Sequence, residues 1–264
     1  MPKDHKDQTI GELIALARDN FSNEEVYRDL LWELRNRASV EMLEKATTLT
    51  ASELADDRIL SVQILCQLGN AKPRFVKQSG NVLLTMLLTE EIPEVIASIA
   101  WGLGHLRTEG AEGQLIGLKD HAAADVRLGV VGGLLGLSTL PAVQTLITLS
   151  RDQNPNVRSW ATFGLGTQIS DDSSAIRQAL VDRLLDDDAE TSSEAVWGLA
   201  QRKDVRAVDC LIKRLSVDTV VYDDLLAAQA LGDGRLLPAL NNLRQYLVEE
   251  REALEKAIRI CESL

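Results

Sequence analysis

Residues that could bind a metal or act as a nucleophile are few and far apart in this chain of 264 residues. Its histidines and cysteines are His5, His105, His121, Cys66, Cys210 and Cys261. No two of them lie at the short spacing that structural metal sites use. No serine occurs in a Gly-x-Ser-x-Gly elbow, and no glycine-rich phosphate loop is followed by a lysine. We therefore expect no catalytic centre, no metal and no cofactor, and hence a protein that is not an enzyme.

Large aromatic side chains give a stronger signal, because they recur at one position in three of the predicted helices. Trp101, Phe163 and Trp197 share this position, and Trp160 lies one helical turn before Phe163. Aromatic residues on an exposed face are typical of interaction sites. The alternative is that the rings pack between helices as ordinary core. A further tryptophan, Trp32, lies outside this set, and we expect it to be buried.

Polar residues accompany the aromatic ones on the same predicted face. Gln229 takes the position of Phe163 in a later copy, while His105 and Asp233 take the position of Thr167. The predicted partner-binding residues are therefore Trp101, His105, Trp160, Phe163, Glu194, Trp197, Gln229 and Asp233. The alternative for the acids of this region, Glu190, Glu194, Asp223 and Asp224, is that they lie at solvated helix ends without a role in binding.

The element that positions these side chains is a helix that the sequence repeats. In residues 154–166, Asn154 is suited to cap a helix and Pro155 to occupy its first turn. Val157, Ala161 and Leu165 then follow the spacing of a buried helix face. Aligned without gaps, the leucine recurs as Leu68, Leu103, Leu134, Leu165, Leu199 and Leu231, at intervals of 35, 31, 31, 34 and 32 residues.

A period of this length holds two helices and a turn, which cannot bury their apolar face alone. Stacked copies bury that face against each other. Glycine precedes the leucine in four copies, as in Gly164, although glycine inside a helix costs about 1 kcal/mol relative to alanine. We interpret this glycine as allowing a neighbouring helix to approach closely. No stretch alternates with the period of a strand.

These patterns predict an all-α fold, a right-handed α-solenoid of helical hairpin repeats. We expect residues 1–53 to form a helical N-terminal cap, 54–245 to form about six repeats, and 246–264 to form a C-terminal capping helix. Ser22 with Glu25, and Ser39, are expected to cap helices of the N-terminal part.

The net charge of the chain limits the kinds of partner that it can bind. The formal charge of −12 disfavours nucleic acid and anionic membrane surfaces, which bind through lysine and arginine. A basic protein is the complementary partner, while the charge also serves solubility. The first seven residues lack the apolar core of a signal peptide, and no run of 18 apolar residues occurs. We therefore expect a cytoplasmic protein that binds no nucleic acid and no membrane.

Two short stretches resemble a known family. Asp125-Val126-Arg127 and Asn156-Val157-Arg158, each followed by a helix rich in small residues, resemble HEAT-like repeats of the phycobilisome-lyase type. The resemblance extends over roughly residues 54–245. It implies that the arginine of the Val-Arg pair bonds an aspartate in a neighbouring repeat. Ungapped alignment keeps this arginine only in Arg127 and Arg158, so we expect an interrupted ladder, with Ser61, Ile96, Ser192 and Asp224 at the other equivalent positions.

A more specific resemblance lies in residues 157–163, 201–204 and 231–240, which are similar to bacterial HEAT-repeat proteins. Some of those are encoded beside Rhs-type polymorphic toxins, where an immunity role is proposed. The resemblance thus implies a protein-binding scaffold with an aromatic and acidic concave groove, and an immunity protein against a basic toxin domain as one form of it. Two alternatives stay open. One is a chromophore (bilin) lyase or its chaperone subunit, and the other is a HEAT-like DNA-repair glycosylase, which the net charge disfavours.

Overall fold

The computed structural model describes residues 7–69, 72–216, 220–247 and 249–263. Within these ranges the regular secondary structure is entirely helical, which confirms the all-α class. Contacts between residues divide the chain into two units, Met1–Leu134 and Leu135–Leu264. Each unit contains four helical hairpins among its described residues, so the repeat that the sequence predicts is the unit of construction in both.

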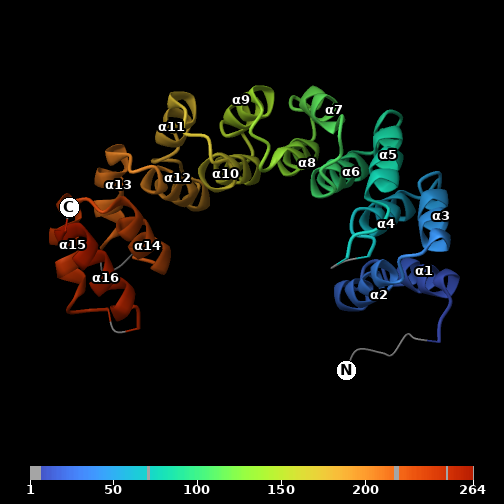
Figure 1. Cartoon of the computed structure of the whole chain (residues 1–264), viewed down its shortest axis with the longest axis horizontal. Helices are drawn as coiled ribbons and strands as arrows, with labels where there is room; N and C mark the ends of the chain where they lie inside the picture. The colour runs from blue at the N-terminus through green and yellow to red at the C-terminus, as the bar shows by residue number, and fades with distance from the viewer. Residues whose placement is uncertain (1–6, 70–71, 217–219, 248, 264) are drawn as a thin grey trace. The chain divides into compact units, whose positions relative to one another are not determined.

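In the first unit, α1 pairs with α2, α3 with α4, α5 with α6, and α7 with α8. The bounds are α1 (Ile10–Asp19), α2 (Glu24–Asn36), α3 (Val40–Leu49), α4 (Ala55–Leu65), α5 (Val76–Leu87), α6 (Pro93–His105), α7 (Ala111–Gly117) and α8 (Ala124–Leu134). The second helices of these hairpins also contact each other in order, α4 on α6 and α6 on α8, and α2 contacts α4 (Figure 1).

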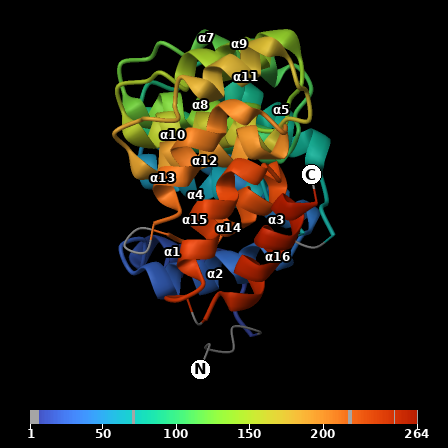
Figure 2. The ribbon, with the colours of Figure 1, turned by 90° about the vertical axis from the view of Figure 1, so that its left-hand side faces the viewer.

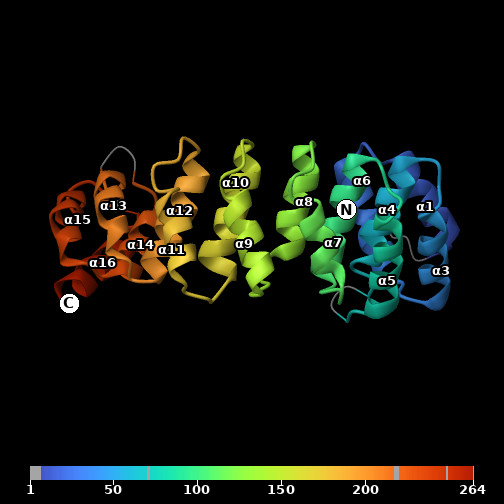
Figure 3. The same ribbon diagram turned by 90° about the horizontal axis from the view of Figure 1, so that it is seen from above.

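The second unit follows the same plan, with α9 paired to α10, α11 to α12, α13 to α14 and α15 to α16 (Figure 1). Its last helices, in orange and red, are nearest the viewer in Figure 2. The bounds are α9 (Leu140–Leu149), α10 (Pro155–Phe163), α11 (Ser174–Val181), α12 (Ala189–Gln201), α13 (Val208–Arg214), α14 (Tyr222–Leu231), α15 (Leu237–Leu243) and α16 (Arg251–Glu262). Here α10 packs on α12, α12 on α14, and α14 on α16 (Figure 3).

The helix used as the template forms as its residues predict. The Asn154 side chain accepts hydrogen bonds from the amides of Asn156 and Val157, and Pro155 is in the first turn of α10. The helix does not continue regularly to residue 166, because Gly164–Gln168 form a π turn. The aligned leucines are all buried, since Leu68, Leu103, Leu134, Leu165, Leu199 and Leu231 are 0–5 % exposed.

The glycine that precedes this leucine makes room for a leucine of the other helix in the same hairpin. A β-carbon added to Gly102, Gly133, Gly164 or Gly198 would lie 2.7–3.5 Å from Leu83, Leu115, Leu146 or Leu180, respectively. Close approach between successive second helices occurs as well, although Gly164 does not provide it. A β-carbon on Gly198 would be 2.7 Å from the Cα atom of Gly166.

The arginine ladder has one more member than the ungapped alignment predicts. Arg58 donates to the carbonyls of residues five and six positions before it, as do Arg127 and Arg158. It also forms a bidentate ion pair with Glu90, at 2.7 and 3.0 Å. Ser61 was therefore the wrong counterpart of Arg158. The alignment slipped by three residues in this copy, where Leu65 is as fully buried as Leu68.

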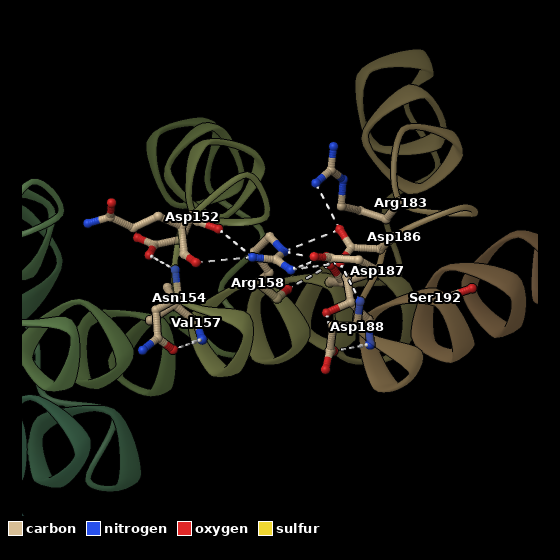
Figure 4. Close-up of polar contacts among 12 residues, drawn as sticks. Asp152, Asn154, Val157, Arg158, Arg183, Asp186, Asp187, Asp188 and Ser192 are labelled. Carbon is tan, nitrogen blue, oxygen red and sulfur yellow. Dashed lines mark hydrogen bonds and ion pairs between the residues drawn. The ribbon is translucent and has the colours of Figure 1, made fainter.

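In the second unit, Arg158 links α10 to the turn before α12 (Figure 4). Its guanidinium donates to Asp186 at 2.8 Å and to Asp187 at 2.8 Å. These bonds, and those to the carbonyls of residues 152 and 153, hold the Asp186 carboxylate where it is almost inaccessible to solvent. Arg158 keeps the pKa of Asp186 below its usual value despite the burial.

Three smaller expectations were wrong. Trp32 is 59 % exposed, because it lies outside the buried face of α2, which is formed by Leu30, Leu31 and Leu34. Asp224 is 2 % exposed rather than solvated, and Arg214 donates to it at 2.6 Å. The cap of α2 is Asn23 and not Ser22.

The expected boundaries at residues 53/54 and 245/246 stay predictions. The contacts place the division between the two units at residues 134/135, and the α3–α4 hairpin spans residue 53. The expected cap at Ser39 is present, because its hydroxyl accepts a hydrogen bond from the amide of Met42.

Candidate functional site

A cavity of about 220 Å³ opens on the second unit, where α10, α12 and α14 are packed in sequence. It is lined by Phe163, Thr167, Ser193, Glu194, Trp197, Asp223 and Leu226. Three of the predicted partner-binding residues, Phe163, Glu194 and Trp197, are thus brought together. We call this set of lining residues, together with the adjacent Trp160, the aromatic-acidic site.

Each helix contributes to the site from a defined position. On α12, Glu194 and Trp197 are three residues apart and therefore project from the same face. Asp188 fixes the start of that helix by accepting a hydrogen bond from the amide of Thr191 at 2.8 Å. Asp223 lies in the first turn of α14, so its carboxylate meets α12 from the next hairpin.

The π turn after α10 supplies Thr167, which is exposed at the cavity. Widening the helix here leaves carbonyl groups without their regular partners. Arg202 satisfies them, donating to the carbonyls of Leu165, Gly166 and Ile169 at 2.8–2.9 Å. Its side chain is 8 % exposed, and burial lowers the pKa of the guanidinium. The arginine therefore anchors the π turn that follows α10 to the end of α12.

The aromatic side chains of the site differ in how far they reach the surface. Trp160 is 41 % exposed, and its ring meets that of Phe163 edge to face, with the centroids 5.7 Å apart and an interplanar angle of 81°. Phe163 and Trp197 are half-buried. Val157 and Ala161 of α10, with Leu165 of the π turn, are fully buried instead. Such half-exposed rings present apolar area to a ligand at little further cost in conformational entropy.

The acidic side chains of the site carry uncompensated charge. Among the described residues, neither Glu194 nor Asp223 forms a hydrogen bond or ion pair through its carboxylate. Glu194 is half-buried, and this burial raises the pKa of its carboxyl, with a further contribution from the negative charges of Asp223 and Glu190. The nearby Arg214 is directed elsewhere, because it donates to Asp224 at 2.6 Å and to the hydroxyl of Ser193 at 2.7 Å.

Two other predicted residues of the second unit make contacts with structural roles. The amide nitrogen of Gln229 donates to the carbonyl of Ala253 at 3.0 Å, which ties α14 to α16. Asp233 caps the 3₁₀ turn Gly234–Leu236 through the amide of Arg235 and forms an ion pair with the guanidinium of that residue at 2.7 Å. Gln229 thus lies within α14 and Asp233 in the connection that follows it, and neither residue lines the cavity.

The remaining two predicted residues, Trp101 and His105, belong to α6 in the first unit. The Trp101 ring covers Gly132 on α8 so closely that no β-carbon would fit there, and the side chain is half-buried. His105 is exposed and lines a separate cavity of about 500 Å³. That cavity is also lined by Trp32, Cys66, Leu68, Pro73 and Arg74. Burial raises the pKa of the Cys66 thiol to about 11, so the thiol is protonated at neutral pH.

Sequence reasoning missed four lining residues, namely Thr167, Ser193, Asp223 and Leu226, as members of the site. The sequence did contain signals for two of them. Thr167 is at the repeat position that also gave His105 and Asp233, and Asp223 is in the first turn of the next repeat helix. Across the part of the chain that the structure describes, no three His, Cys, Asp or Glu side chains gather as metal ligands would. Likewise, none of the helices in the described ranges combines the length and apolar character of a membrane span.

Comparison with known proteins agrees with this architecture. Residues 142–232 match the family model described as HEAT repeats. The chain is 35 % identical over 137 residues to protein YibA of Escherichia coli, strain K12 and O157:H7 alike. This match covers 52 % of the chain and 48 % of YibA, so the chain spans about half the length of the curated relatives it matches.

Solved structures extend the similarity beyond that region. The X-ray structure of E. coli YibA superposes with a TM-score of 0.81 at 25 % identity, covering 98 % of this chain and 94 % of that one. An engineered protein superposes with a TM-score of 0.60 at 17 % identity, covering 96 % of this chain and 78 % of the other, and this likeness concerns the fold alone. The chain is thus an all-α solenoid of HEAT-like helical hairpins, with a HEAT-repeat match over residues 142–232 and similarity to YibA.

Proposed function

We propose that the protein is a non-enzymatic scaffold that binds another protein through the aromatic-acidic site of its second unit. The observation that carries this proposal is the unpaired Glu194 carboxylate beside Trp197 and Phe163. In the free protein, half-burial and like-charge repulsion make this arrangement unfavourable. Surfaces that sacrifice stability in this way commonly serve binding. HEAT repeats often mediate protein interactions, which is consistent with this role.

The partner's chemistry follows from the same residues. Exposed rings supply the contact area of interface hot spots, and surrounding negative charge speeds the association of a positively charged protein. A basic toxin domain has this character, and we propose an immunity role against such a domain as the specific form of the function. The three cysteines are free thiols, which fits a reducing compartment such as the cytoplasm as its place of action.

Alanine substitutions at Trp160 and Trp197 test the proposal. Each should weaken a partner complex by about 2 kcal/mol, or roughly thirtyfold in Kd, while thermal melting changes little. The measurement is affinity capture from the native host with quantitative mass spectrometry, followed by titration of the captured protein. Trp32→Ala is the matched control, because Trp32 is also exposed but lies in the first unit.

Two results would contradict the proposal. If the wild-type protein and both variants capture the same proteins in the same amounts, the site does not take part in partner binding. A loss of about 3–5 kcal/mol in the free energy of unfolding would instead show that the rings are core.

The glycosylase alternative receives some support from the same geometry, because an acidic group with a raised pKa beside aromatic rings could act on a flipped base. Unpaired Glu194 and Asp223 would, however, repel backbone phosphates, and the net charge is −12. Measuring the affinity for duplexes that carry a modified base decides between the two. Binding in the micromolar range or tighter at 150 mM salt would favour the alternative.

The lyase alternative depends on the first unit. Its cavity of about 500 Å³ is in the size range of small-molecule sites, and Trp32, Leu68 and Pro73 give it apolar walls. Titration with a free bilin, followed by absorbance, tests this reading. A Trp32→Ala variant that loses the absorbance change would support the alternative, and the aromatic-acidic site would then not be the principal one.

A further inference from the structure

The size of the cavity in the aromatic-acidic site limits what can enter it. Its volume of about 220 Å³ lies below the roughly 300–1,000 Å³ of typical small-molecule sites. The space suits one long side chain projecting from a larger molecule. Two of the walls, Phe163 and Trp197, are aromatic, and Leu226 adds apolar surface, so the stem of the occupant must be apolar.

Charge determines what such a side chain carries at its tip. Three buried or partly buried acidic side chains elsewhere in the second unit have arginine partners: Asp186 bonds Arg158, Asp224 bonds Arg214, and Asp233 bonds Arg235. Glu194 and Asp223 have no such partner within the described residues. Since the two carboxylates repel each other across the cavity, a positive charge placed between them would relieve the repulsion.

We propose that the cavity receives one cationic side chain of the partner protein, with its stem against Trp197 and Phe163 and its charge between Glu194 and Asp223. Arginine fits best, because its planar guanidinium stacks on an aromatic ring and donates to carboxylates in a fork. Lysine carries the same positive charge but has no planar group to stack on the aromatic ring. The inference rests on the proposed function and specifies the residue that the partner must present.

The test uses the full chain and three short peptides, acetyl-Gly-X-Gly-amide with X as arginine, lysine or citrulline. Citrulline keeps the shape of arginine but is neutral. The readout is the indole N–H resonance of Trp197, assigned with a Trp197→Phe variant and followed by NMR during titration. The arginine peptide should shift this resonance at millimolar concentration, and the citrulline peptide should bind at least fivefold more weakly. Equal affinity for both peptides would overturn the proposal.

Substitution of the carboxylates gives the second arm. Glu194→Gln and Asp223→Asn should each weaken binding of the arginine peptide at least fivefold while leaving both rings in place. Glu252→Gln is the matched control, since it removes the same charge from an exposed position on α16. Affinity that is unchanged in both site variants, or reduced equally in the control, would overturn the proposal. Unchanged melting curves would show that the variants are folded.

The two proposals can fail separately. If Trp197→Ala abolishes capture of the protein partner but Glu194→Gln and Asp223→Asn do not reduce it, the surface binds a partner and the cationic side chain is wrong. If the tryptophan variants leave capture unchanged, the proposed function fails, whatever the peptides do.

Discussion

At the scale of single residues, the carboxylate of Glu194 is in an environment that disfavours its negative charge. A carboxylate on a helix surface is normally solvated or paired, as Glu255 is with Arg244. Glu194 has no such partner among the described residues and is only partly solvated, because the face that carries it also carries Trp197, and the next hairpin presents Asp223. Burial and repulsion both favour its neutral form. The residue therefore opposes folding at neutral pH.

Replacing Glu194 with a neutral residue should remove this destabilisation, so the variant should gain stability in a pH-dependent way. A carboxyl whose pKa is raised on folding stabilises the protein below its unfolded pKa, and this contribution is lost as the pH rises through the folded pKa. Glu194→Gln should therefore melt like wild type near pH 4 and at a higher temperature at pH 7. The difference should open as the pH rises from about 4.5, the ordinary value for glutamate.

Thermal melting between pH 4 and 8, followed by circular dichroism, measures this difference. Glu252→Gln should show no comparable trend, because that side chain is exposed. A Glu194→Gln variant that is less stable than wild type at pH 7 would mean that the carboxylate has a stabilising partner.

Glycines set the packing distances at the scale of the helical elements. Gly198 faces Leu180 in its own hairpin and Gly166 in the previous one, so it serves both the hairpin and the stack. Gly164 faces the ends of leucine side chains, which can move aside. Arg202 completes this junction by bonding the carbonyls of the π turn. The junction thus depends on a small residue and a buried cation together.

We expect alanine at Gly198 to destabilise the protein by about 1–3 kcal/mol, the usual cost of overpacking, because its β-carbon would meet the backbone of Gly166. Gly164→Ala should cost less. Gly113→Ala is the matched control in α7, where an added β-carbon meets nothing within 4 Å, and it should be neutral or stabilising by up to about 1 kcal/mol. Urea denaturation gives all three values. If Gly198→Ala were as harmless as Gly113→Ala, the close approach would be unimportant to stability.

Buried acid–arginine pairs act at the scale of the whole molecule, because they occur in both units. Arg58 with Glu90 in the first unit, and Arg158 with Asp186 in the second, join successive hairpins. The pKa values of both carboxyls are lowered on folding. Such groups contribute stability that is present above the unfolded pKa and is lost as the pH falls through the folded one.

We therefore expect the melting temperature to fall steeply below about pH 4, opposite in sign to the effect of Glu194. Arg158→Gln should reduce stability at pH 7 but have a smaller effect once the pH has fallen through the lowered pKa of Asp186, where that carboxylate becomes protonated. Calorimetry at several pH values tests both statements, with Arg259→Gln as a control at an exposed position of α16. An equal loss for Arg158→Gln at every pH would show that packing, and not charge, gives this arginine its importance.

The sequence by itself determined the repeating helix, its cap at Asn154 and the buried leucine that it carries, because these depend on local propensity and on a period written into the chain. It also singled out Phe163, Glu194 and Trp197, which line one cavity. The tertiary structure decided which of those residues meet. The π turn, the pairing of Arg58 with Glu90, and the position of Asp223 opposite Glu194 all depend on how one hairpin is set against the next. An ungapped repeat alignment contains no such information, since a slip of three residues leaves another leucine in the buried position.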